Sequence, residues 1–171
     1  MSETVSVAIV SDTHGYLDER VAAIVAECDY ALHAGDICGA GVLEEMRPRR
    51  RVIAVRGNND VEGFWPAGED AILAEIPQTA TLDLPGGTLA MEHGHKHGFN
   101  TPSHDSLRLS YPAASVVVYG HTHIQVCDTE TTPWVLNPGA SGQTRTRGGP
   151  GCLVLYAGPD EWRVVAHRFE N

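Results

Sequence analysis

Five short apolar segments of this chain each run directly into a side chain that can bind a metal ion. The segments are VAIV, ALHA, VIAV, LAME and VVVY, and they lead into SDTH, GD, RGNND, HGH and GHTH. In an α/β sheet, side chains from separate loops converge in the crevice beyond the carboxyl ends of the strands. The pattern therefore predicts an α/β sheet with a polar cluster at one edge.

The order of segments in the first third of the chain predicts parallel strands. Strands are expected over Val5–Val10, Tyr30–Ala34 and Arg51–Val55. Apolar residues at helical spacing predict a helix over Leu17–Cys28, and a short helix is expected near Val42–Met46. Strands that alternate with helices imply crossover connections, which join parallel neighbours.

After Pro77 the pattern changes, and we expect a largely antiparallel second half. TATLDL and TLAMEH flank Pro85-Gly86-Gly87, which is typical of a β-hairpin. A helical segment from Ser103 to Leu109 precedes further strands in SVVVY, WVLNPG, CLVLYAG and WRVVAHRF. The glycine-rich stretch from Ala140 to Gly151 is interpreted as a mobile surface loop. One domain over residues 1–171, with two mixed sheets flanked by helices, is the simplest architecture.

Composition limits the partners and the compartment. No apolar run approaches the ~18 to 20 residues of a bilayer crossing, and the N-terminus does not resemble a secretory signal, so we expect a cytoplasmic protein that makes no use of a membrane. The formal net charge of −10 argues against nucleic acid as a stable partner. The sequence is compatible with a homo-oligomer.

Seven side chains with oxygen or nitrogen donor atoms stand at the strand ends. They are Asp12, His14, Asp36, Asn58, His93, His121 and His123. Two carboxylates, one amide and four imidazoles are too many for one tetrahedral zinc ion, which takes four ligands. The set suits two divalent ions that share a carboxylate, and such a pair activates water for attack at phosphorus.

The donor types also narrow the choice of metal. Nitrogen and oxygen donors without a thiolate favour transition metals over calcium or magnesium. We take manganese as the first choice, with nickel, iron, zinc and cobalt as alternatives. Two such ions bring a charge of about +4 against the two carboxylates, so an acidic protein can hold a phosphate ester there.

Each motif by itself also has a structural explanation. Asp-x-His is common at surfaces and caps, Gly-Asp and Asn-Asn-Asp are common in turns, and the segment His93 to His97 could be a solvated loop. The conjunction of all five motifs, each directly after a strand, is what favours a metal centre.

These residues resemble the calcineurin-like metallophosphoesterase superfamily, whose motifs are D-x-H, G-D, G-N-x-x-D/E, H-G and G-H-x-H. Asn137-Pro138-Gly139 and the HGHxxG string beginning at His93 are similar to the small bacterial and archaeal phosphodiesterase branch. The resemblance implies a four-layer αββα sandwich and a metal-dependent phosphodiesterase that uses a metal-bridging hydroxide. It also implies a division of ligands: Asp12, His14 and His123 for one ion, Asn58, His93 and His121 for the other, and Asp36 as the bridge.

One position departs from the wider superfamily. Many members carry a histidine directly after the ligand asparagine, whereas this chain has Asn59. An amide can contact phosphate but cannot act as a general acid, so His95 is the candidate proton donor, with water as the alternative. Arg145 and Arg147 are candidate substrate contacts, with simple solvation as the alternative.

Two other functions remain compatible with these motifs. A retromer subunit of eukaryotes shares the implied fold and serves as a non-catalytic protein-interaction scaffold. A phosphomonoesterase would use the same centre on a dianionic phosphate. A scaffold has no use for seven crowded ligands, so the leading hypothesis is an enzyme acting on a small-molecule phosphodiester.

Overall fold

Strand β1 (Val5–Val10) is buried on both faces. In the computed structural model, which describes residues 3–171, Val5, Val7 and Ile9 face one apolar cluster, while Ala8 and Val10 face another. This alternation follows from the two-residue period of a strand. A strand that is apolar on both faces needs a packed layer on each side.

The first sheet has five strands in the order β10-β9-β1-β2-β3. Strands β1, β2 and β3 are parallel, as the sequence predicts, while β9 and β10 are antiparallel. The other bounds are β2 (Tyr30–His33), β3 (Arg51–Ala54), β9 (Gly151–Ala157) and β10 (Trp162–Arg168).

The second sheet has the order β4-β5-β6-β8-β7. Its bounds are β4 (Thr79–Leu84), β5 (Gly87–Glu92), β6 (Val116–Val118), β7 (Gln125–Asp128) and β8 (Trp134–Pro138). The hairpin β4–β5 forms as predicted. The expectation of a largely antiparallel second half is wrong for the centre of this sheet, where β5, β6 and β8 are parallel. The reason is that β6 returns after α4 (His104–Ser110), which acts as a crossover.

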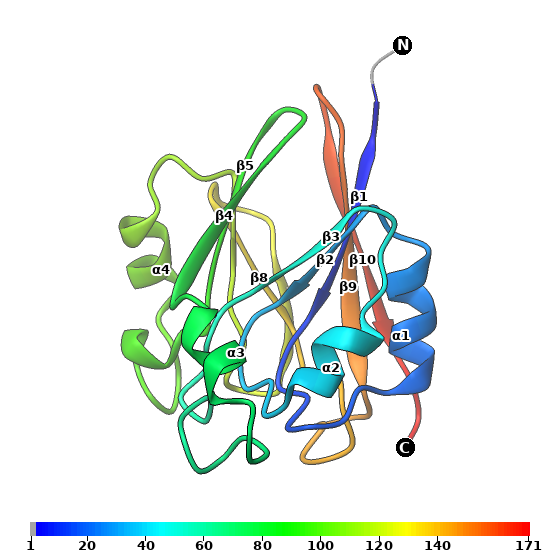
Figure 1. The fold of residues 1–171 in the computed structure, drawn as a ribbon. Coiled ribbons are helices and arrows are strands. Elements are labelled where there is room, and N and C mark those ends of the chain that lie inside the picture. Colours follow the sequence, from blue (N-terminus) through cyan, green and yellow to red (C-terminus); the bar gives the residue numbers. More distant parts are fainter. Residues whose placement is uncertain (1–2) are drawn as a thin grey trace.

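Four layers result, and the predicted αββα sandwich is confirmed (Figure 1). One apolar cluster fills the space between the sheets. A second lies between the first sheet and the helices α1 (Glu19–Ala26), α2 (Ala40–Glu45) and α3 (Asp70–Glu75). A third lies between the second sheet and α4. Figure 1 shows α4 outside one sheet and α1 outside the other.

The sequence patterns missed three short elements. They are α3, β7 and the 3₁₀ turn η1 (His95–His97). Strand β7 is only half-buried, so its apolar signal is weak. None of the helices formed by residues 3–171 has the length and apolar sequence that a bilayer crossing needs.

The interpretation of residues 140–151 as a mobile loop needs correction at its N-terminal end. Ser141 is buried, its backbone N–H donates to Ser11 O (2.9 Å), and its hydroxyl donates to Gly151 O (2.7 Å). Thr146 is also buried. These contacts attach the segment to the end of β1, which is the edge where the polar motifs lie.

Candidate metal centre

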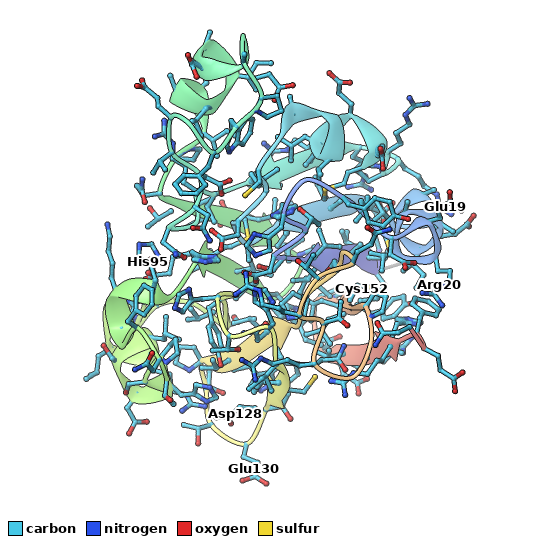
Figure 2. The ribbon with its side chains drawn as sticks, turned by 90° about the horizontal axis from the view of Figure 1, so that it is seen from below. Glu19, Arg20, His95, Asp128, Glu130 and Cys152 are labelled. Atoms are coloured by element: carbon cyan, nitrogen blue, oxygen red, sulfur yellow. The ribbon has the colours of Figure 1, made fainter. Side chains whose placement is uncertain are left out.

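The predicted ligands come together at the carboxyl ends of β1, β2, β3, β5 and β6. The loops that follow these strands gather at the lower end of Figure 1, and Figure 2 views the molecule from that end. Two groups of side chains have ligand atoms within 4.8 Å of one another: Asp12 with His14 and His123, and Asp12 with Asp36 and His93.

The two carboxylates lie between two pairs of histidines, His14 with His123 and His93 with His121. Asp12 Oδ1 lies 3.3 Å from His123 Nε2 and 3.9 Å from His93 Nε2. Asp36 Oδ2 lies 3.7 Å from His14 Nε2 and 3.5 Å from His93 Nε2. Each carboxylate therefore has one oxygen near histidines of both groups, which is the placement that a bridging ligand requires.

Asn58 joins two histidines from the second sheet. Its Oδ1 lies 3.0 Å from His93 Nε2 and 3.1 Å from His121 Nδ1. The structure thus brings together Asn58, His93 and His121, the three residues that the resemblance assigns to one ion. Their roles as ligands stay predictions.

Hydrogen bonds on the far side of each ring determine which histidine nitrogen faces the cluster. His93 Nδ1 donates to Ala34 O (2.7 Å), and His123 Nδ1 donates to Arg145 O (3.0 Å). His121 Nε2 donates to Phe99 O. A carbonyl oxygen only accepts, so these nitrogens carry the proton in a neutral ring and the other nitrogen offers a lone pair to a metal.

This arrangement fits a cation. Asp12 Oδ1 is buried and has no hydrogen-bond partner. In the neutral form of the two rings, the Nε2 lone pairs of His93 and His123 face this oxygen at 3.9 and 3.3 Å, so acceptor atoms converge there and only a bound proton or metal ion satisfies them. Burying such atoms together is unfavourable unless a positive charge lies among them.

The pKa values of His93 and Asp36 also show that this cluster favours bound positive charge. Burial alone would lower the pKa of His93, but its hydrogen bond to Asp36 and the charges of Asp12 and Asp36 outweigh burial and raise the pKa to about 9. Burial alone would raise the pKa of Asp36, yet His93 and the Asn59 N–H hold it well below its usual range. Protons or metal ions can therefore neutralise the cluster.

The backbone at the ligands is strained. Asp12, His14, Asp36, His121 and His123 all have φ between 47° and 72°, a region that residues other than glycine rarely adopt. Such conformations cost about 1 to 3 kcal/mol each and persist where the surrounding structure enforces them, often at functional sites. Gly57 is required for space, because a Cβ there would overlap the carboxylate of Asp36.

Asp60 is a buried residue that supports the loops without facing the cluster. Its carboxylate accepts from Ile37 N (2.9 Å), Cys38 N (2.9 Å) and Gly57 N (2.7 Å), and from Trp65 Nε1 (2.9 Å). It joins the loop after β2 to the loop after β3. The sequence showed Asp60 only as the last residue of the segment Gly57-Asn58-Asn59-Asp60, and its burial was the missing signal.

Asn137 supports the GHTH turn in a similar way. It is fully buried at the end of β8, and its Nδ2 donates to Gly120 O (2.9 Å) and Thr122 Oγ1 (3.1 Å). Its Oδ1 accepts from Gly139 N (2.9 Å). The side chain therefore fixes the turn that carries His121 and His123.

Asn59 contacts the carboxylate of Asp36 through both its backbone and its side chain. Its backbone N–H donates to Asp36 Oδ1 and its Nδ2 donates to Asp36 Oδ2, both at 2.9 Å. The residue expected to contact phosphate thus orients Asp36 in this structure.

His95 lies beside the second group of histidines, and Figure 2 labels it. Its ring centroid is 5.4 Å from that of His93 and 6.0 Å from that of His121, and its Nδ1 is buried without a partner. Burial first, and then the positive charges of His93 and His121, lower the pKa of His95 below its ordinary value. The ring is therefore mainly neutral at pH 7.

Arg145 and Arg147 lie on the exposed part of the loop between β8 and β9. Arg145 meets the cluster through its backbone oxygen, which accepts from His123. Its charge also contributes to lowering the pKa of His14, after the larger effect of burial. Arg147 is exposed two residues further on.

Two mixed sheets in an αββα sandwich, with paired carboxylate and imidazole groups at the strand ends, define a protein with a candidate dinuclear metal centre. A family model described as the calcineurin-like phosphoesterase superfamily domain matches residues 5–158. The chain belongs to this superfamily, as its motifs indicated.

A sequence relative places the chain in the branch of small phosphodiesterases. Phosphodiesterase YfcE of Escherichia coli (strain K12) is 31% identical in an alignment of 152 positions, and the alignment covers 76% of this chain and 76% of the relative. This relative supports the expectation of a metal-dependent phosphoric ester hydrolase.

Solved structures agree with the fold. An archaeal phosphodiesterase superposes with a TM-score of 0.68 at 25% identity and covers 95% of this chain and 99% of its own. Vacuolar Protein Sorting 29 from Cryptosporidium parvum superposes with a TM-score of 0.72 at 18% identity. The superposition covers 98% of this chain and 99% of that protein. The second likeness shows the shared fold alone.

Proposed function

We propose that this chain is a dinuclear-metal phosphodiesterase that hydrolyses a small-molecule phosphodiester, with manganese as the metal. The observation that carries the proposal is the convergence of acceptor atoms from five strand ends around Asp12 and Asp36. One ion would be held by Asp12, His14 and His123, and the other by Asn58, His93 and His121, with Asp36 between them.

Two ions at these ligands would lower the pKa of a water molecule and neutralise charge on the phosphate. The chain's own residues would orient the ligands and the substrate. Asn59 holds Asp36 through two hydrogen bonds, which fixes the direction of the proposed bridging carboxylate. The exposed side chains of Arg145 and Arg147 would contact the phosphate ester from the neighbouring loop.

The leaving group needs a proton only when it is a strong base. His95 is the candidate donor, but its lowered pKa leaves little protonated imidazole at neutral pH. We therefore propose that leaving groups of low pKa, such as phenolates, depart without an acid. Alkoxide leaving groups would depend on His95 for a proton.

A scaffold function would leave the cluster unexplained. The buried, unpartnered Asp12 Oδ1 and five strained ligand positions destabilise the fold, and protein docking would not select for them. The relatives named as phosphodiesterases support the enzyme, and the low-identity structural likeness adds no argument for a scaffold.

The test combines metal content with activity. Elemental analysis should find two metal ions per chain, and protein supplied with Mn²⁺ or Ni²⁺ should cleave bis(p-nitrophenyl) phosphate faster than p-nitrophenyl phosphate. Asp36→Asn should lower diesterase activity by about 100-fold or more, because it removes a ligand charge.

Asp160→Asn is the matched control, since Asp160 is exposed in the turn between β9 and β10. Its activity should equal that of the wild type. Two bound ions without activity on either ester would contradict the enzyme and favour a binding role. Faster monoester cleavage would replace the diesterase by a phosphomonoesterase.

A further inference from the structure

Exposed apolar side chains gather on the loops of the metal cluster. Seven large apolar side chains are exposed in the described chain. Five of them lie on the loops that carry the proposed ligands: Tyr16, Val61, Phe64, Phe99 and Ile124. Single exposed apolar residues are ordinary, but five of seven on the ligand-bearing loops make these loops the candidate surface for contact with an apolar group.

Phe99 is the member of this set with a direct contact to the cluster. Its side chain is 63% exposed, and its ring centroid lies 4.7 Å from the ring centroid of His121 at an interplanar angle of 71°. Its carbonyl oxygen accepts from His121 Nε2. The ring therefore stands beside a proposed metal ligand while most of its surface faces solvent.

The exposure of Phe99 is built into its loop. Gly98 has φ of +121°, and a Cβ there would lie 2.6 Å from Thr101 O, so only glycine fits this tight turn. His97 attaches the loop to the protein, since Nε2 contacts Glu92 Oε1 and Nδ1 contacts Ser106 Oγ, both at 2.7 Å. The backbone on the N-terminal side of Phe99 is thus held in place.

We propose that Phe99 forms the wall of a specificity subsite that binds an aromatic or other apolar ester group of the phosphodiester. This inference rests on the proposed function, because the phosphate must sit at the metal ions for its ester group to reach Phe99. Ions held by the proposed ligands would attract the phosphate but would give no contact to the carbon side of the ester. An exposed aromatic ring next to a ligand supplies that contact, by stacking or edge-to-face packing.

The experiment compares two substrates that release the same p-nitrophenolate. Bis(p-nitrophenyl) phosphate carries a second aromatic ester, whereas methyl p-nitrophenyl phosphate carries a methyl group in its place. Phe99→Ala should lower kcat/KM for the aromatic diester by about three- to ten-fold and leave the methyl diester within about two-fold of the wild type. Phe99→Leu should lie between the wild type and Phe99→Ala.

Leu109→Ala is the control, because Leu109 is 81% exposed on α4, outside the loops of the cluster. It should not change the preference. An equal loss on both diesters in Phe99→Ala, or no loss on either, would overturn the proposal. Metal content measured on every variant shows whether the cluster itself has been disturbed.

A binding measurement separates this inference from the proposed function. Calorimetry on the metal-loaded protein should show tighter binding of phenylphosphonate than of methylphosphonate. Phe99→Ala should weaken the binding of phenylphosphonate by about three- to ten-fold relative to that of methylphosphonate. If the wild type cleaves no diester, the proposed function fails. The phosphonate affinities still show whether Phe99 contacts an apolar group next to the metal centre. Equal binding of both phosphonates by the wild type would contradict it.

Discussion

At the scale of single residues, buried polar side chains hold the ligand loops together. Asp60 receives four N–H groups from two loops, and His33 forms a second link. His33 Nδ1 accepts from Gly35 N (3.2 Å), so its Nε2 carries the proton and donates to Thr13 Oγ1 (2.9 Å). These contacts connect the residues that flank Asp12 and Asp36, which explains how strained ligand conformations are maintained.

Asp60→Ala should destabilise the protein by about 3 to 5 kcal/mol, because several buried N–H groups lose their acceptor. Asp60→Asn should cost less, since one oxygen remains. Urea unfolding monitored by circular dichroism measures both variants. Asp105→Ala, at an exposed carboxylate, is the control and should stay within about 0.5 kcal/mol. A loss below about 1 kcal/mol in Asp60→Ala would contradict this role.

His33 should make stability depend on pH. Burial, as the main cause, lowers the pKa of His33 from 6.5 to about 4 in the folded protein. Between these values the unfolded chain binds a proton that the folded chain does not, so the free energy of unfolding falls as the pH drops below 6.5. The loss approaches about 3 kcal/mol by pH 4.

Unfolding of the wild type and of His33→Gln between pH 7 and pH 4.5 checks this expectation. The variant should be less stable at pH 7 but should lose less of its stability on acidification, because it has no imidazole to protonate. Parallel pH curves for the two proteins would show that His33 does not titrate in this way.

At the scale of elements, a side chain near the end of one strand fixes the turn that follows its neighbour. Strand β8 carries Asn137 one residue before its end, and the Asn137 side chain fixes the turn after β6, which places His121 and His123. This support depends on β6 and β8 being neighbours in the sheet. The sequence contains both motifs, but the parallel pairing of the two strands was not predicted, because pairing depends on contacts across the sheet.

Asn137→Ala should lower metal affinity by about 10- to 100-fold, since residues that orient ligands typically contribute this much. It should also cost about 1 to 3 kcal/mol of stability through lost buried hydrogen bonds. Competition with a chelator of known affinity gives the first quantity and urea unfolding the second. Unchanged metal affinity, even with lowered stability, would limit Asn137 to a structural role.

At the scale of the whole molecule, the proposed ligands come from both sheets. Asp12 and Asp36 follow strands of the first sheet, whereas His93 and His121 follow strands of the second. Metal ions bound among them would link the two sheets at one end of the sandwich. Ions that bind only the folded chain must therefore stabilise it.

Removal of metal should lower the melting temperature. With Mn²⁺ at about 100 times its dissociation constant, the folded state should gain about 2.7 kcal/mol over protein treated with EDTA. Differential scanning calorimetry measures the change. Asp12→Asn should show a smaller gain, because it removes charge from the carboxylate that both groups share. An equal gain in Asp12→Asn would place the stabilising ion elsewhere.

The sequence by itself was sufficient for the family, the sandwich fold and the candidate ligands. The family and the sandwich follow from the resemblance of the motifs, and the candidate ligands depend on a local feature, polar motifs placed directly after apolar segments. The ligand division that the resemblance implies stays a prediction.

Only the tertiary structure decided which atoms meet. It paired β5, β6 and β8 in parallel, turned Asn59 onto Asp36, buried Asp60 beneath two loops and set Phe99 beside His121. These contacts join residues far apart in the chain or depend on how a loop is held, so no local pattern contains them. Their physical origin is the packing of two sheets that brings separate strand ends to one edge.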